Sequence, residues 1–166
     1  MYKSTSLDKK IKTYFSNINN LHSVIKIINK VKPNLIFHLA AQPLVLKSYK
    51  NPIKTWQSNL LASLNILEAS RSLNKKITII MITSDKCYKN KEIKRGYVEM
   101  DELGGDDPYS ASKACSELVT HAYRKSFTKN NPIGIATARA GNVIGIGDFS
   151  ENRLFPDIMR AEIENK

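Results

Sequence analysis

Residues 77–88 read ITIIMITSDKCY, an apolar run that passes directly into polar residues. Residues 77–82 are apolar apart from Thr78, a pattern typical of a parallel strand that is covered on both faces. Ligands of open parallel sheets bind at the carboxyl ends of the strands. The stretch therefore predicts a buried central strand whose polar exit, residues 83–86, lies at a binding site.

Helix and strand patterns alternate before this run. Residues 12–16 can form a short strand, and residues 21–31 carry apolar side chains at helical spacing. The sequence LIFHL at residues 35–39 predicts a buried strand. Pro52 can open a helix that runs to about residue 71, since proline suits the first helical position.

The same alternation continues downstream. Asp107 and Pro108 suit the N-cap and first position of a helix over residues 109–127. Residues 133–138 predict another buried strand, and residues 153–164 a last helix. Strands that alternate with helices indicate an α/β fold with a parallel sheet. The expected inner stripe of the helix over residues 109–127 is Ala111, Cys115, Leu118 and Ala122.

Tyr109 and Lys113 stand four residues apart on that predicted helix, so their side chains share a face. A nearby ammonium favours the phenolate form of tyrosine. Tyr109 is therefore a candidate base for a sugar or alcohol hydroxyl. Spacing alone is weak evidence, because a solvated lysine one turn from a packed tyrosine gives the same pattern.

Polar or small residues also follow the other two predicted strands. His38-Leu39-Ala40-Ala41-Gln42 ends one of them, and the small Ala40 and Ala41 would let a flat ring or a ribose approach the backbone. The sequence RAGN at residues 139–142 ends the other. The three strand ends together predict one ligand site at a single edge of the sheet.

These three strand ends and the Y-x-x-x-K spacing, in this order, resemble the extended short-chain dehydrogenase/reductase family, the NAD-dependent epimerases and dehydratases. The match runs from about residue 12 to residue 160. Within that family, the longer strings resemble the CDP-glucose 4,6-dehydratase type, whereas related dehydratases usually read T-D-E in place of Ser84-Asp85-Lys86. The strings are HLAAQPLV (38–45), TSDKCY (83–88), LGGDDPYSASKACSELVT (103–120), ARAGNVIG (138–145) and ENRLFPD (151–157).

The resemblance implies a lyase that uses NAD without net redox change. Hydride leaves sugar C4, water leaves from C5 and C6, and the hydride returns to C6. Tyr109 would take the O4 proton and Ser84 would hydrogen-bond O4, with the neighbouring Thr83 a less favoured donor. Asp85 would protonate the departing 6-hydroxyl, and Lys86 stands where relatives carry a glutamate base.

The resemblance also implies which residues bind the ligands. Lys113 would bind the nicotinamide ribose, and Asn142 would meet the diphosphate of the nucleotide-sugar substrate, CDP-glucose. The implied cofactor-binding residues are Asn17, Ile18, Leu39, Ala40, Ala41, Gln42, Asn59, Thr83, Tyr109 and Lys113, and the implied substrate-binding residues are Asn142 and Arg153. No metal site is expected.

The segment before the first predicted helix departs from the family pattern. Relatives read Asp-Ile-x-Asp there, and the first residues touch adenine, whereas this chain reads NINN at residues 17–20. The amide of Asn17 can still hydrogen-bond adenine. Asn19 or Asn20 can cap the helix that follows.

Glycine is missing from the first part of the chain. The first of the seven glycines is Gly96, so residues 1–95 hold no glycine-rich nucleotide loop. The family's first strand, glycine loop and second strand would precede residue 12. We therefore expect an internal fragment: a partial, doubly wound Rossmann-like sheet over residues 1–166 that lacks the first βαβ unit, with the substrate lobe starting at about 150–166. Such a chain should be marginally stable, aggregate or shift its first strand, and it should bind NAD negligibly on its own.

Composition excludes several other classes. The net charge is +11, and residues 1–67 carry ten lysines and one acidic residue. The lysines are scattered and no nucleic-acid-binding motif occurs, so nucleic-acid binding is not expected. Cys87 and Cys115 form no C-x-x-C pair, which suits a reducing cytoplasm rather than structural zinc. No run is long enough to span a membrane, and no signal peptide is evident.

Three alternatives stay open at this point. Another nucleotide-sugar dehydratase or an epimerase of the same family would carry the same Y-x-x-x-K pair. A non-catalytic truncated product, or a weak nucleic-acid binder, would fit the missing loop and the basic first part. The helices after HLAA and after Tyr109 commonly form the dimer interface of the family, so a homodimer is expected of the parent protein.

Overall fold

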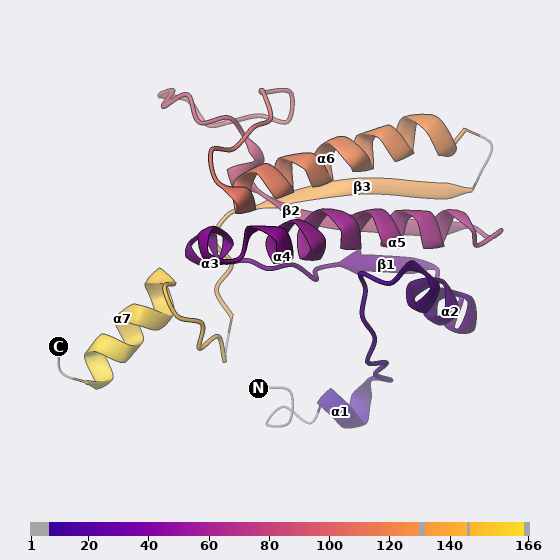
Figure 1. Ribbon diagram of the computed structural model, residues 1–166, viewed down its shortest axis with the longest axis horizontal. Helices are drawn as coiled ribbons and strands as arrows, with labels where there is room; N and C mark the ends of the chain where they lie inside the picture. The colour runs from indigo at the N-terminus through magenta and orange to yellow at the C-terminus, as the bar shows by residue number, and fades with distance from the viewer. Residues whose placement is uncertain (1–6, 130–131, 146, 165–166) are drawn as a thin grey trace. The chain divides into compact units, whose positions relative to one another are not determined.

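The computed structural model describes residues 7–129, 132–145 and 147–164 (Figure 1). The chain divides into two compact units, Ser16–Gly141 on the one hand and Met1–Phe15 with Asn142–Lys166 on the other. The described residues of the smaller unit form two helices, α1 (Leu7–Lys10) and α7 (Leu154–Ile163). A last helix was predicted from the sequence, and α7 confirms it.

The larger unit is an α/β layer with a three-stranded sheet. The strands are all parallel and lie in the order β1-β2-β3. This confirms the α/β class and the parallel sheet that the alternation predicts. The elements are α2 (Leu21–Val31), β1 (Leu35–His38), α3 (Val45–Lys50), α4 (Pro52–Trp56), the π-helical η1 (Gln57–Leu61), α5 (Ala62–Arg71), β2 (Ile77–Ser84), the 3-10 turn η2 (Asp85–Cys87), α6 (Pro108–Phe127) and β3 (Ile133–Ala140).

Side-chain caps fix where the predicted helices begin. The Asn20 side chain accepts a hydrogen bond from the backbone N–H of Ser23 at 3.0 Å, at the start of α2. Asp107 accepts from the backbone N–H groups of Tyr109 (2.9 Å) and Ser110 (3.0 Å), at the start of α6. Each cap satisfies donors that the first helical turn leaves without an intrahelical partner.

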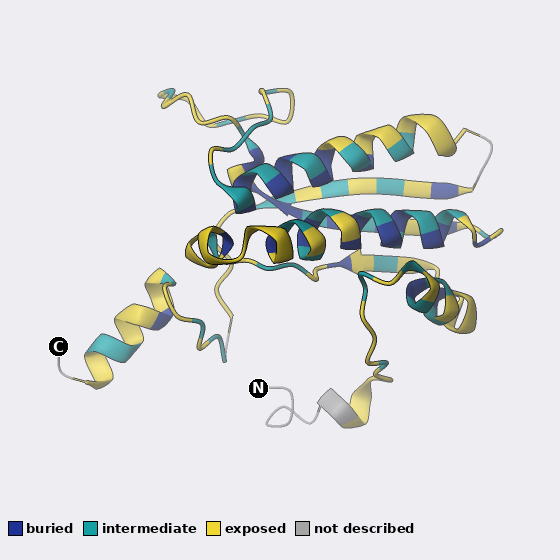
Figure 2. Ribbon diagram, viewed as in Figure 1, coloured by how far each residue is buried: buried dark blue, intermediate teal, exposed yellow. Residues whose placement is uncertain are grey.

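An apolar core lies on one face of the sheet. In β2, the alternate residues Ile77, Ile79 and Met81 are each at most 1% exposed. Figure 2 shows buried segments in dark blue along α5 and α6. They pack against residues of α2 and the α5 region, and Figure 1 shows α5 and α6 running along the strands. The buried members of this core are Val24, Ile28, Leu67, Ala69, Leu73, Ile77, Ile79, Met81 and Ile133.

The opposite face of the sheet is open. Phe37 on β1 is 56% exposed, and Leu35 and the following Leu39 are also exposed. The strands predicted at residues 35–39 and 133–138 are confirmed as β1 and β3, but the expectation that they are buried is wrong, since only His38 in β1 and Ile133 in β3 are buried. The physical reason is that α2, α5 and α6 pack on one face only, in the described part of the chain.

Two segments differ from the sequence prediction. Residues 12–16 form no strand, because a strand requires a neighbour for its backbone hydrogen bonds and the described strands pair only as β1-β2-β3. The helix predicted from Pro52 exists but contains the π-helical η1, and α3 was not predicted. Within the described ranges, no helix is both long and apolar enough to cross a bilayer.

The inner face of α6 is polar, so the predicted apolar stripe is wrong. Leu118 is 56% exposed, Ala122 is exposed, and Ala111 and Cys115 are half-buried. Hydroxyl groups can be buried here because they bond to carbonyls of their own helix. Ser116 donates to the Ser112 carbonyl at 2.9 Å, and Thr120 donates to the Ser116 carbonyl at 2.7 Å. The buried residues of α6 are Tyr109, Ser110, Ser112, Lys113, Ala114, Ser116, Glu117 and Thr120.

Candidate functional site

The carboxyl end of β2 meets the first half of α6. Lys113 donates a hydrogen bond from Nζ to the backbone carbonyl of Ile82 at 3.1 Å. Tyr109 and Lys113, one helical turn apart, are each 7% exposed. Two candidate catalytic groups therefore lie beside the strand end that carries the predicted polar exit.

A glycine lets the loop that precedes α6 lie close to the first turn of that helix. A Cβ atom on Gly105 would lie 2.6 Å from the backbone N of Ala111 and from the backbone C of Ser110, closer than real Cβ contacts. The loop therefore passes directly against the first turn of α6, and only glycine fits there. Sequence reasoning did not single out Gly105, although its place two residues before the capping Asp107 was a visible signal.

Burial controls the charges around Lys113. Burial lowers the pKa of Lys113, while Cys87 and Glu117 act in the opposite direction. Burial and the nearby Lys113 charge lower the pKa of His38 to about 4, so its imidazole is neutral near pH 7. The Nε2 atom of His38 is buried and has no hydrogen-bond partner. An unsatisfied buried ring nitrogen at the end of β1 is a group that a ligand can engage.

Asn59 joins the segment after β1 to α6. Its Oδ1 accepts from the backbone N–H of Gln42 at 2.8 Å, and its Nδ2 donates to the Gln42 carbonyl at 3.2 Å and to Ser112 Oγ at 2.8 Å. Ser112 in turn donates to the Tyr109 carbonyl at 2.7 Å. Two predicted cofactor-binding residues, Asn59 and Gln42, are thus connected to the turn of α6 that holds Tyr109.

The turn after β2 holds the remaining predicted catalytic residues. Thr83 and Ser84 are buried and belong to the strand itself, whereas Asp85 and Lys86 are exposed on η2. Ser84 Oγ donates to Asp85 Oδ1 at 3.1 Å and accepts from the backbone N–H of Lys86 at 3.2 Å. Asp85 Oδ2 lies 3.7 Å from the position that a Cβ on Gly141 would take, so the ends of β2 and β3 are adjacent.

The small residues after β1 differ in exposure. Leu39 is 68% exposed and Ala40 is exposed, whereas Ala41 and Gln42 are half-buried. An exposed alanine at a strand end leaves the backbone open to a ligand. This arrangement suits the role that was predicted for the segment.

Three of the other predicted ligand-binding residues make hydrogen bonds outside the network of Asn59 and Lys113. The side chain of Asn17 accepts from the backbone N–H of Asn19 at 3.0 Å, and the Ile18 carbonyl accepts from Asn65 Nδ2 at 2.8 Å. Asn142 and Arg153 belong to the smaller unit, where Arg153 donates to Asp148 at 3.1 Å. The structure therefore joins the strand-end residues to one another but leaves Asn142 and Arg153 in a separate unit.

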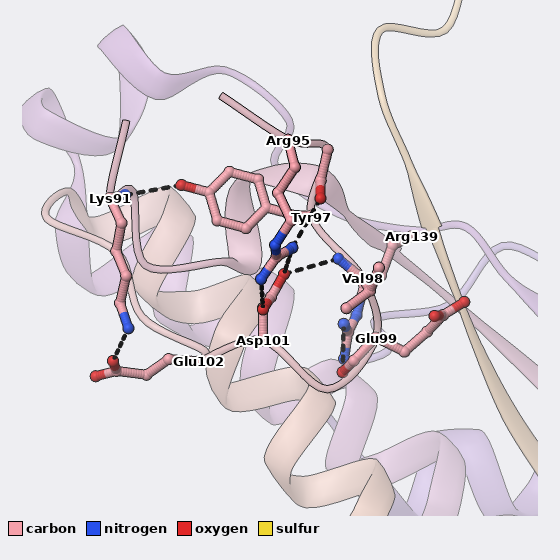
Figure 3. A network of polar contacts seen from close by, with 9 residues as sticks. Lys91, Arg95, Tyr97, Val98, Glu99, Asp101, Glu102 and Arg139 are labelled. Carbon is pink, nitrogen blue, oxygen red and sulfur yellow. Dashed lines mark hydrogen bonds and ion pairs between the residues drawn. The ribbon is translucent and has the colours of Figure 1, made fainter. Parts of the chain in front are cut away.

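An ordered loop follows η2 and is anchored on β3 (Figure 3). Arg95 forms two hydrogen bonds with the Asp101 carboxylate, at 2.7 and 2.6 Å, and Asp101 also accepts from the backbone N–H of Val98. Arg139 of β3 donates to the Glu99 carbonyl at 3.1 Å, and its guanidinium lies 4.8 Å from the Tyr88 ring centre.

A cavity of about 1030 Å³ opens between this loop, α6 and β3, and Asp85, Glu117 and Arg139 are among the residues that line it. It brings the exposed Asp85 of η2 into the same space as the buried Glu117 and the half-buried Arg139. The candidate site therefore extends from the strand ends towards the loop.

Comparison with known proteins identifies the family of this chain. The family described as GDP-mannose 4,6 dehydratase matches residues 1–165. The chain belongs to this family. Membership of the dehydratase family confirms the resemblance to NAD-dependent epimerases and dehydratases that the strand-end motifs indicated.

Two curated relatives illustrate the match to the dehydratase family. The chain is 39% identical over 171 residues to the CDP-glucose 4,6-dehydratase of Salmonella typhimurium strain LT2, covering 100% of this chain and 48% of that protein. It is 29% identical over 160 residues to a UDP-glucose 4-epimerase of Mycoplasma genitalium, covering 91% of this chain and 46% of that protein. The chain thus spans about half the length of these relatives.

A solved dehydratase structure has the same fold. The dTDP-glucose 4,6-dehydratase DesIV of Streptomyces venezuelae, a double mutant with NAD and DAU bound, superposes with a TM-score of 0.84. The match covers 98% of this chain and 48% of that one at 19% identity. At this identity, the likeness establishes the Rossmann-like fold.

Proposed function

We propose that the chain carries the catalytic residues of an NAD-dependent sugar-nucleotide 4,6-dehydratase that acts on CDP-glucose. The observation that carries this proposal is the buried Tyr109–Lys113 pair, which α6 holds against the end of β2 through the bond from Lys113 to the Ile82 carbonyl. The 39% identity to a CDP-glucose 4,6-dehydratase supports the choice of substrate.

Tyr109 takes the proton from the sugar O4 in this proposal. The ammonium of Lys113 favours the phenolate, because opposite charges that are shielded from water attract strongly. Ser84 hydrogen-bonds O4 and holds the hydroxyl in line for proton transfer. The position of Ser84 at the last residue of β2 supports this role.

Asp85 and Lys86 carry the elimination of water. Oxidation at C4 makes the C5 proton acidic, so a base can remove it while an acid protonates the leaving 6-hydroxyl. Asp85 is the acid, and Lys86 stands where a base would act. Their exposure on η2 leaves both side chains accessible to a ligand.

The residues around β1 suit the nicotinamide end of NAD. NAD supplies the transient hydride acceptor for the sugar C4 carbon. The exposed Ala40 leaves the backbone accessible to the cofactor, and Lys113 donates hydrogen bonds to the ribose hydroxyls. The buried Nε2 of His38 has no hydrogen-bond partner and is available to a ligand. Residues 1–95 contain no glycine for a pyrophosphate loop, so we expect negligible NAD affinity when this chain is titrated alone in a calorimeter.

A product assay tests the proposed function. The intact parent protein, which contains residues 1–166, is incubated with CDP-glucose, dTDP-glucose, UDP-glucose and GDP-mannose. The products are identified by NMR. We expect a 4-keto-6-deoxy sugar from CDP-glucose, whereas a C4 epimer would support the epimerase alternative.

Tyr109→Phe should reduce turnover at least 1000-fold while bound cofactor is retained, and full activity of this variant would refute the role of Tyr109.

We also propose that two copies associate through α3, α4 and α6, and that the protein acts in the cytoplasm. Exposed apolar side chains on these helices support the dimer: Leu46, Tyr49, Ile53 and Leu118 are 55%, 60%, 70% and 56% exposed. The free thiols of Cys87 and Cys115 support a reducing compartment. Light scattering tests the dimer, and a monomer at micromolar concentration would contradict it.

A further inference from the structure

Glu117 lies one turn beyond Lys113 on the buried face of α6. It is 5% exposed, and its carboxylate accepts hydrogen bonds from the two strands beneath. Thr83 of β2 donates to Oε1, while Thr137 and Arg139 of β3 each donate to Oε2 at 3.0 Å. The carboxylate therefore joins one helix to the ends of two strands.

The carboxylate of Glu117 is a buried charge. Replacing a buried ion pair by apolar groups of similar volume is often neutral or stabilising, so packing alone does not require charge here. Burial raises the pKa of Glu117, but the hydrogen bonds from Arg139, Thr83 and Thr137 and the Arg139 charge outweigh it, so the net shift is downward. Glu117 is thus held as an anion among the candidate catalytic residues.

We propose that Glu117 is a positioning residue for the reaction: it fixes the end of β2 against α6 and balances the charge that Lys113 experiences. The inference rests on the proposed function for its kinetic consequence. Lys113 bonds to the Ile82 carbonyl and Glu117 bonds to Thr83, so successive residues of β2 are held by successive turns of α6. Ser84 and Asp85 follow at once, and their placement depends on this pair of bonds.

Arg139 extends the same arrangement to the loop. Its guanidinium pairs with Glu117, donates to the Glu99 carbonyl and lies over the ring of Tyr88. The Arg139 side chain is 15% exposed, so solvent screens the ion pair weakly. Loss of the Glu117 charge would leave this guanidinium uncompensated next to the site.

The direction of the electrostatic effect follows from the groups around Lys113. His38 faces it from β1 and Cys87 from η2, while Glu117 lies on its own helix and Arg139 pairs with Glu117 from β3. Without the Glu117 anion, the Lys113 cation is less favoured and the Tyr109 phenolate is more favoured. The acid limb of the pH–rate profile reports the ionisation of Tyr109 and the alkaline limb that of Lys113. Both limbs should therefore move to lower pH.

Glu117→Gln tests the inference in the protein that carries residues 1–166. We expect kcat to fall at least tenfold with a smaller change in KM, and both kinetic pKa values to fall by half a unit or more. The exposed Glu151→Gln is the matched control and should change neither. An unchanged pH profile in a folded Glu117→Gln protein would overturn the proposal.

A titration of Lys113 separates this inference from the proposed function. The ¹³Cε shift of Lys113, assigned with Lys113→Arg, is followed against pH in the wild type and in Glu117→Gln. We expect a lower midpoint in the variant, whether or not CDP-glucose is turned over. An unchanged midpoint would contradict the proposal, while failure of the wild type to convert any nucleotide sugar would contradict only the proposed function.

Two further variants keep the test decisive. Glu117→Gln combined with Arg139→Gln removes both charges, so the Lys113 midpoint should return towards that of the wild type. If Glu117→Gln does not fold, Arg139→Gln alone leaves the anion without its counter-ion and should raise the Lys113 midpoint. A midpoint that does not rise in this second variant would refute the charge balance.

Discussion

The interior next to α5 and the interior under α6 are packed by different means. Beside α5, Ile77, Ile79 and Met81 of β2 face an apolar cluster. Under α6, the buried groups are hydroxyls, an amide, an ammonium and a carboxylate, each placed by specific partners. In the apolar region, stability depends on how well the side chains fill the space between β2 and α5. In the polar region, hydrogen bonds fix where the candidate catalytic groups lie.

The largest expected effect belongs to the apolar region. Ile79→Ala removes a side chain that is 0% exposed and should lower the free energy of unfolding by about 2–5 kcal/mol. Urea denaturation measures this loss. Ile163→Ala, at a position 76% exposed, is the control and should change stability by less than about 0.5 kcal/mol. Equal losses in the two variants would break the comparison.

Acid should expose the next largest effect, in the polar region. Burial and Lys113 lower the pKa of His38 from 6.5 to about 4. The unfolded chain therefore binds the His38 proton at a higher pH than the folded chain does. The contribution of the neutral imidazole to the free energy of unfolding is present in full above pH 6.5. It is lost as the pH falls towards 4, by about 3 kcal/mol in all. Denaturation of the wild type and of His38→Phe between pH 7 and 4 measures this loss.

The His38→Phe variant should show a smaller loss over that range. His22→Gln, at an exposed position, should behave as the wild type does. If His38→Phe and the wild type lose stability in parallel, the neutral buried imidazole is not the cause.

Asn59→Ala should have the smallest of the three effects. It leaves the backbone groups of Gln42 and the hydroxyl of Ser112 without the amide that now bonds them. Unpaired buried polar groups of this kind cost about 1–3 kcal/mol. Thermal unfolding measures the loss, with the exposed Asn74→Ala as control. No loss at Asn59 would show that water replaces the amide and that the polar region tolerates substitution.

The sequence predicts the parts of the fold that local patterns determine. The caps at Asn20 and Asp107 and the apolar run of β2 depend on neighbouring residues, so these elements were found. A strand at residues 12–16 was wrong because pairing is a tertiary property. The predicted inner face of α6 was wrong because hydropathy favours exposed positions for Ser112 and Ser116. Both are buried, since their hydroxyls donate to carbonyls of the same helix.

The candidate site follows the same rule. The polar exit of the apolar run pointed to Ser84, because ligands of parallel sheets bind at the carboxyl ends of strands. The Y-x-x-x-K spacing on a predicted helix pointed to Tyr109 and Lys113. Nothing local distinguishes Glu117 from the exposed glutamates, because its partners Thr83, Thr137 and Arg139 are brought to it only by folding. The roles of the individual site residues stay predictions.

The π-helical η1 lets the helix from Pro52 to Arg71 hold one residue more than a regular α-helix would over the same turns. Because the wider turn takes up that residue, the two halves keep their facing: Asn59 bonds to Gln42 while Leu67 stays in the core. Deleting one residue within Gln57–Leu61 would return the helix to regular geometry with little rotation of one half against the other. Deleting one residue from the regular turns of α5 would instead rotate everything that follows by about 100°. A point deletion should therefore be better tolerated in η1 than in α5.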